Sequence, residues 1–270
     1  MYMFISILIT MFIILALSKM SKLKRSSLKR KYDSLVLLRE ILLLCRQHRM
    51  QTHHILQCTH EIRSNKALDA VYDKLMVKSS QLVRIVNAEN KPMYRVFQRN
   101  LKVMHSSWKE QSISRNQIIH GKTIRHCMFL MDEIAITWLV ESGRNDVSNQ
   151  YHNNWQQVFD CMELLTQLRV VIQDYHNPTG KVRINHYCQK MSSKLNQLSI
   201  ICPLAMGAPT SSNAMDLLNE ISTSQDSNPT EHELYQLTSD ISLVIAQVYD
   251  HILSDMTKQL YHQLPAAVLN

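Results

Sequence analysis

The sequence predicts an all-α protein, a bundle of long helices that carries one transmembrane helix at its N-terminus. Gly and Pro are scarce, with 4 and 6 among 270 residues. β-Sheet and Rossmann-type folds need such turn residues, so their scarcity favours helices. The first 18 residues carry no charge, and apolar residues further along recur at helical spacing.

Residues 1–18, MYMFISILITMFIILALS, are near the lower limit of the roughly 17–25 apolar residues that span a bilayer. A basic juxtamembrane segment follows at 19–32, without an acidic residue. Its seven cations are Lys19, Lys22, Lys24, Arg25, Lys29, Arg30 and Lys31. By the positive-inside rule this flank stays in the cytoplasm, which predicts a single-pass protein of the cytoplasmic membrane with its remaining residues in the cytoplasm. A cleavable signal peptide is the alternative, but its preceding positive charge and small cleavage-site residues are missing.

The charge balance disfavours nucleic acid as a partner. Of 30 basic residues, 23 remain against 22 acidic ones once the seven juxtamembrane cations are set aside. The body is therefore close to neutral, whereas nucleic-acid binding would need a basic face on it. Anionic lipids attract the juxtamembrane charge instead. The six cysteines form no close-spaced framework, which suits reduced thiols in the cytoplasm.

A single helical domain is expected over 33–265. Its breaks have local causes in Asn, Pro and Gly residues and in a polar loop at 224–230, where Thr230 can cap the last helix with Glu233. The helices are expected at 33–62, 66–87, 93–111, 115–142, 148–176, 181–200, 212–222 and 231–263.

Two of these helices show an apolar stripe at 100° per residue. The stripe of the first consists of Leu38, Ile41, Leu42, Cys45, Thr52 and Leu56. That of the 148–176 helix consists of Cys161, Leu164, Leu165, Leu168, Val171, Ile172 and Tyr175. Such stripes pack against other helices, so a bundle is the simplest architecture.

Three arginines are candidate anion-binding residues. Arg49 falls inside its stripe, about 40° from the centre, and a guanidinium facing a bundle loses water and needs an anion. Arg169 lies at the edge of its stripe. Arg125 shares a face with Asp132 in a mostly apolar helix. The alternative for Arg49 is a structural salt bridge to a carboxylate or snorkelling to the surface, and for Arg125 it is a salt bridge to an acid of another helix; both are favoured over contact with an anion.

Histidines cluster between residues 48 and 60, but their spacing does not indicate zinc. His54 and Cys58 lie four apart on one face, yet a zinc site usually needs four ligands and the H-E-x-x-H and C-x-x-C patterns are absent. We interpret these histidines as solvated or capping. Phosphate loops and nucleophile elbows are also absent, so we expect no metal, no cofactor and no enzymatic activity.

Three segments resemble the all-helical nitrate- and nitrite-sensing (NIT) domain family of bacteria. They are LREILLLCRQHRMQTHHIL at 38–56, HGKTIRHCMFLMDEIAITWL at 120–139 and WQQVFDCMELLTQLRVVIQDY at 155–175. The resemblance implies two four-helix bundles sharing long helices, with a small anion held between helices by arginines.

On this resemblance, Arg49 matches the arginine of the family's early motif, Arg169 is similar in placement to a later one, and Arg125 is a weaker candidate. A planar guanidinium can donate two parallel hydrogen bonds to planar nitrate. Two residues depart from the family pattern: Met50 stands where Gly is usual and His48 where an acid is common.

The expected function is that of a non-enzymatic, membrane-anchored sensor of nitrate, nitrite or a similar small oxyanion. No output module is recognisable, so the sensor would pass a helix shift to a separate protein, and a homodimer is one open option. The alternative is a helical adaptor or structural protein at the membrane whose arginines are salt-bridged. A helical metal-binding enzyme centred on the histidine cluster is a weaker third.

Overall fold

The computed structural model describes residues 2–57, 66–223 and 229–265, without the side chains of 2–9, 23, 24 and 206. These ranges are helical and contain no strand, which confirms the predicted class. The helices are α1 (Tyr2–Gln57), α2 (Lys66–Ile85), α3 (Lys91–Ser107), α4 (Ile113–Glu141), α5 (Asn145–Val171), α6 (Pro178–Ile201), α7 (Pro203–Met206), α8 (Pro209–Thr223) and α9 (Glu231–Leu260). Two 3₁₀ turns, Trp108–Glu110 and Ile172–Asp174, follow α3 and α5.

Local sequence sets several helix ends. Thr230 caps α9 in a capping box with Glu233, as its position predicts. Ser112 caps α4 by accepting the Arg115 amide at 3.2 Å. Gly143, at φ 67°, allows the left-handed turn between α4 and α5.

The first helix differs from its predicted division. The predicted anchor, the predicted juxtamembrane segment and the first bundle helix form one continuous α1, because no Pro or Gly lies between residues 18 and 33 to end it. Residues 58–62, expected at its end, lie outside the described residues.

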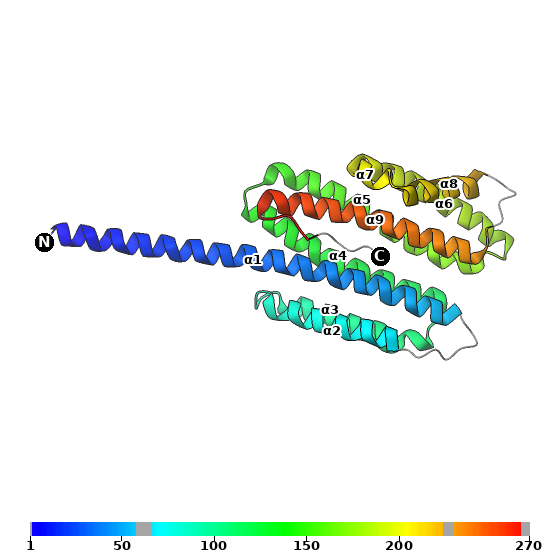
Figure 1. Ribbon diagram of the computed structural model, residues 1–270, viewed down its shortest axis with the longest axis horizontal. Helices are drawn as coiled ribbons and strands as arrows, with labels where there is room; N and C mark the ends of the chain where they lie inside the picture. The colour runs from blue at the N-terminus through cyan, green and yellow to red at the C-terminus, as the bar shows by residue number, and fades with distance from the viewer. Residues whose placement is uncertain (1, 58–65, 224–228, 266–270) are drawn as a thin grey trace.

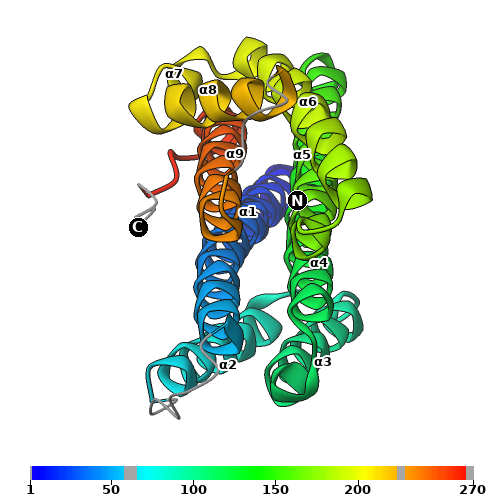
Figure 2. The ribbon, with the colours of Figure 1, turned by 90° about the vertical axis from the view of Figure 1, so that its right-hand side faces the viewer.

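The helices form two groups of four. In one group α1 packs on α2 and α4, and α3 closes the square; in the other α5 packs on α6 and α9, and α8 closes it. Figure 2 shows the groups one above the other, with α9 over α1 and α5 over α4. Four helices, α1, α4, α5 and α9, therefore occupy the centre of the body.

The core follows the predicted stripes. All members of the α1 stripe are buried except Leu56, and all members of the α5 stripe except Tyr175, which is half-buried like Leu56. Trp138 and Trp155 are among the largest fully buried side chains. Burial of a large apolar side chain contributes about 1.5–3 kcal/mol, so these stripes stabilise the packing of α1 and α5 against their neighbouring helices.

The two bundles meet along two different interfaces. At the α4–α5 interface, a Cβ added to Gly121 would lie 2.8 Å from Thr166 Oγ1, so the glycine permits close approach of the helices. The backbones of α1 and α9, in contrast, do not pack closely. Long side chains bridge them: Arg46 Nη2 donates to Ser242 Oγ at 2.8 Å, and Arg39 pairs with Asp250.

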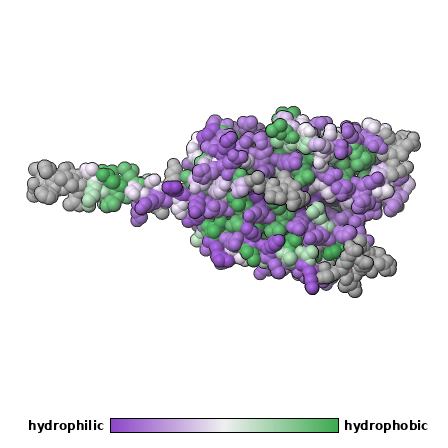
Figure 3. Space-filling model, viewed as in Figure 1, coloured by the Kyte–Doolittle hydropathy of each residue, from purple (hydrophilic) through white to green (hydrophobic). Residues whose placement is uncertain are grey.

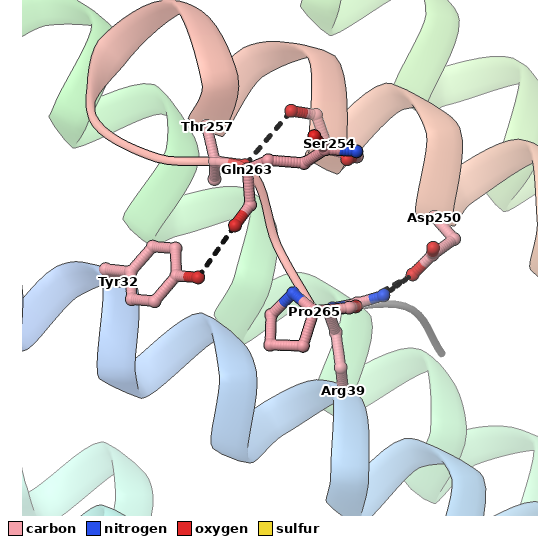
Figure 4. A network of polar contacts seen from close by, with 7 residues as sticks. All are labelled: Tyr32, Arg39, Asp250, Ser254, Thr257, Gln263 and Pro265. Atoms are coloured by element: carbon pink, nitrogen blue, oxygen red, sulfur yellow. Dashed lines mark hydrogen bonds and ion pairs between the residues drawn. The ribbon is translucent and has the colours of Figure 1, made fainter. Parts of the chain in front are cut away.

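The segment after α9 returns to α1 (Figure 4). Arg39 Nη1 donates to the Pro265 carbonyl at 2.9 Å and its Nε to Asp250 Oδ1 at 2.7 Å. Tyr32 Oη donates to the Gln263 carbonyl at 2.8 Å. These bonds tie the end of the second bundle to α1.

The first half of α1 projects from the body (Figure 1). The side chains of Met11, Phe12, Ile13, Ile14, Leu15, Leu17 and Met20 are exposed, and Figure 3 shows this hydrophobic stretch followed by a hydrophilic one. The projection from residue 2 to residue 27 is roughly 40 Å long at 1.5 Å per residue. Across the part of the chain that the structure describes, no helix has an apolar run sufficient to cross a membrane, and half of the predicted anchor, residues 1–9, lies outside the described side chains.

The cysteines within the described ranges, Cys45, Cys127, Cys161, Cys188 and Cys202, are buried and free, whereas Cys58 lies outside those ranges. Burial raises the pKa of the Cys45 thiol to about 12. The Cys45 thiol is therefore a protonated core side chain.

The turn between α5 and α6 gives a first prediction, because a Cβ at Gly180 would lie 1.8 Å from the Asp174 carbonyl oxygen. Gly180→Ala should lower the free energy of unfolding by about 1–3 kcal/mol, since the backbone must move. Gly207→Ala is the control, because its nearest atoms are 3.7 and 3.8 Å away, and it should change stability by no more than about 1 kcal/mol. Urea unfolding followed by circular dichroism measures both; equal effects would contradict the packing described.

Candidate functional site

Arg49 lies on α1 where that helix faces the centre of the body, and only 4% of it is exposed. The structure therefore confirms the inward position expected from the stripe. Among the described residues, its guanidinium has neither a hydrogen-bond acceptor nor a carboxylate partner. Burial, and then the charge of Arg46 one turn earlier, lower the pKa of Arg49 to about 9.

Arg169 approaches the same region from α5 and is also 4% exposed. Its Nε donates to Thr238 Oγ1 at 3.1 Å and its Nη2 to the Thr238 carbonyl at 2.8 Å. Tyr235 Oη donates to the Arg169 carbonyl at 3.4 Å. Arg169 therefore joins α5 to the first turns of α9, and all its partners are neutral.

Arg49 of α1 and Arg169 of α5 interact electrostatically. The pKa of Arg169 is held well below its usual range, chiefly by burial and then by the charges of Arg49 and Arg46. Arg49 and Arg169 also both act on His53. Two buried cations in one region without a carboxylate are costly, since the penalty for removing each charge from water is several kcal/mol.

The third predicted arginine lies elsewhere. Arg125 Nη1 lies 3.0 Å from Glu163 Oε2 and donates to Thr166 Oγ1, also at 3.0 Å. Glu163 is about half exposed, so this pair belongs to the rim of the α4–α5 interface. Arg125 is thus paired with an acid of another helix and does not share the surroundings of Arg49 and Arg169.

His53 is the residue of this site that the sequence did not single out. It lies four residues after Arg49, hence on the same face of α1, and its ring centroid is 4.1 Å from that of Tyr235. Both ring nitrogens are buried and without a hydrogen-bond partner in the described part of the chain. Burial, then Arg49, Arg169 and His54, lower the pKa of His53 to about 4.

A chain of three histidines lies on the other side of α1. His48 Nδ1 lies 2.8 Å from His120 Nε2, and His48 Nε2 lies 3.0 Å from His105 Nδ1. His120 Nδ1 faces the Asn116 carbonyl at 2.9 Å, so this nitrogen must donate. His120 Nε2 therefore accepts from His48 Nδ1, and His48 Nε2 accepts from His105 Nδ1.

This chain corrects the expectation of solvated or capping histidines, because His48 is fully buried. Burial lowers the pKa values of His48 and His120 to about 3, so both are neutral. Cys58 and His60 of the predicted cluster lie outside the described residues. Within the described ranges, His, Cys, Asp and Glu side chains form no group of three that could hold a metal.

The site thus contains hydrogen-bond donors rather than nucleophilic groups. Among the described residues, the guanidinium of Arg49 has no hydrogen-bond partner, Arg169 has N–H groups beyond those that Thr238 occupies, and the neutral His53 has one N–H. Guanidinium forks are suited to planar oxyanions. The arrangement thus provides hydrogen-bond donors from α1 and α5 beside Tyr235 and Thr238 of α9.

The unpaired charge gives a second prediction. In a buffer of bulky anions, Arg49→Met should raise the free energy of unfolding by about 1–4 kcal/mol, because a buried charge is replaced by an apolar chain. Arg39→Met on the same helix is the control: it leaves Asp250 without its partner and should cost about 1–3 kcal/mol. Urea titration measures both; a loss at Arg49 as large as that at Arg39 would show that Arg49 is structurally paired.

The buried histidines His48 and His120 give a third prediction, which concerns the pH dependence of stability. The pKa values of His48 and His120 are lower in the folded than in the unfolded chain, so the unfolded state binds more protons between about pH 6.5 and pH 3. Stability should be full above pH 6.5 and fall below it, by up to about 1.4 kcal/mol per pH unit for each histidine. His120→Asn should flatten the dependence between pH 7 and 5. A wild-type stability that is constant over that range would contradict buried neutral histidines.

Comparison of the chain with models of protein families, with curated proteins and with solved structures finds no match.

Proposed function

We propose that the protein is a membrane-anchored, non-enzymatic sensor that binds nitrate, nitrite or a similar small oxyanion between Arg49 and Arg169. One observation carries the proposal: two guanidinium groups are buried together without a carboxylate among the described residues. Most inward arginines are paired with acids. Here the missing countercharge is the feature that a bound anion would supply.

The donor set favours a small, flat ligand. Arg49 can present two parallel N–H groups to two oxygens of one anion, as guanidinium groups do with carboxylate and nitrate. Arg169 is already held by Thr238, so it is fixed in place before the anion arrives. The two groups come from different bundles, and an anion between them would lie at the junction of both.

The resemblance to the NIT family points the same way. Its early motif falls on the segment that carries Arg49, and its later segment on the one that carries Arg169. The two residues that depart from the family pattern, His48 and Met50, do not lie between the two arginines. His48 is hydrogen-bonded to His105 and His120, and Met50 is exposed. The family's small anion is therefore the first ligand to test.

We propose that α1 transmits the effect of anion binding to a partner protein. It carries Arg49 and continues without interruption into the projecting half, whose apolar residues precede the basic segment (Figure 1). We propose that this half anchors the chain in the cytoplasmic membrane, with the body on the cytoplasmic side. An anion that prefers one arrangement of α1 against the second bundle would shift α1, and a partner protein would sense that shift.

The fourth prediction tests the site by isothermal calorimetry of nitrate and nitrite against the full chain in detergent micelles. Saturable binding is expected, with a loss of at least about tenfold in affinity for Arg49→Ala, since a charged hydrogen bond contributes about 1.5–3 kcal/mol.

Arg125→Gln is the matched control, because Arg125 is already neutralised by Glu163. It should leave the affinity unchanged. If neither anion produces heat or a thermal shift at millimolar concentration, the sensor proposal fails and the membrane-bound adaptor becomes the better account.

A further inference from the structure

We propose that His53 is a third anion-contacting residue and that the anion enters the site together with one proton, which the His53 imidazole takes up. This inference rests on the proposed function. It adds a ligand contact and a regulation by pH to the two arginines.

The position of His53 is the first argument. It lies one helical turn beyond Arg49 on α1 and packs against Tyr235 of α9, whose hydroxyl donates to the Arg169 carbonyl at 3.4 Å. The ring therefore lies where α1, α5 and α9 meet. A ligand that touched both guanidinium groups would lie within its reach.

The unused nitrogens are the second argument. Both Nδ1 and Nε2 of His53 are buried, and neither has a hydrogen-bond partner among the described residues. Buried polar atoms of native proteins are nearly always satisfied, so each exception asks for an explanation. The three histidines on the opposite side of α1 show the contrast, because both ring nitrogens of His48 are bonded. An anion oxygen beside His53 would supply the missing acceptor.

The surroundings of His53 determine the protonation state of its ring. The groups that act on or contact it are Arg49 and His54 of α1, Arg169 of α5 and Tyr235 of α9. Among the described residues no carboxylate acts on His53 itself, whereas Glu231 of α9 acts on Tyr235. In the free protein burial, and then the charges of Arg49, Arg169 and His54, lower the pKa of His53 to about 4, so the ring is neutral. A bound monoanion adds an attraction that the free site lacks.

That attraction is large enough to matter near neutral pH. Two unit charges about 4 Å apart near a protein surface change a proton affinity by roughly 1000-fold. The bound anion would therefore raise the pKa of His53 above its value of about 4 in the free protein. By linkage, protonation of His53 strengthens anion binding by the same factor. One anion and one proton enter, the proton forms an N–H bond on the His53 ring, no other covalent bond changes, and the added charge is zero.

The test is calorimetry of nitrate with the full chain at pH 6 and pH 8, in pairs of cationic buffers with different ionisation enthalpies. At pH 6 we expect uptake of nearly one proton per nitrate and an affinity about tenfold higher than at pH 8. His53→Gln, which keeps hydrogen-bonding groups but cannot be protonated, should bind nitrate without proton uptake and with an affinity that does not depend on pH. His54→Gln, at the adjacent exposed position, is the control and should behave as the wild type.

The possible failures are distinct. Nitrate binding without proton uptake, or uptake that persists in His53→Gln, would overturn the inference while leaving the arginine site intact. A His53→Phe variant, which keeps the contact with Tyr235, guards against loss of folding and should also bind without uptake. No binding by the wild type at either pH would instead refute the proposed function.

Discussion

An unbalanced positive charge between the two bundles is the feature on which the proposed function depends. Arg49 and Arg169 bring positive charge into a region that α1, α5 and α9 shield from water, and no acid of the described chain neutralises it. Arg39, only ten residues before Arg49 on α1, is paired with Asp250. The proposed anion site and a structural ion pair therefore lie on the same helix, and the two arginines differ in whether a carboxylate of the described chain is present.

The packing of the bundles suits such a site. The α4–α5 interface is close, because Gly121 admits Thr166, and it can act as the fixed side of the junction. On the other side, α1 and α9 are bridged by long polar side chains rather than packed backbones. A packed core does not deform gradually, so we propose that a bound anion acts through the polar bridges between α1 and α9 rather than through the α4–α5 contact.

The helical class, the apolar stripes and the inward position of Arg49 could be predicted from the sequence, because all three follow from periodicity along one helix. The same reasoning divided α1 into separate pieces, since a change from apolar to basic residues suggests a boundary although no helix breaker is present. The surroundings of Arg125 and His48 could not be predicted in this way. Their partners, Glu163, His105 and His120, are far away in sequence, so only the packing of other helices determines them.

The sequence also gave little indication of His53. Its place one turn after Arg49 was visible, but its importance comes from what it lacks, a partner for either ring nitrogen. An absent partner leaves no pattern in a sequence. Composition and spacing can thus predict that a charged side chain lies inside a bundle. Whether that side chain has a hydrogen-bond or ion-pair partner depends on the whole fold.

A crystal structure of the protein soaked in nitrate would test the central claim most directly. The account predicts trigonal density within hydrogen-bond distance, about 2.7–3.2 Å, of the guanidinium nitrogens of both Arg49 and Arg169. A carboxylate of the chain itself against Arg49, or two guanidinium groups that remain without nitrate in the soaked crystal, would contradict it.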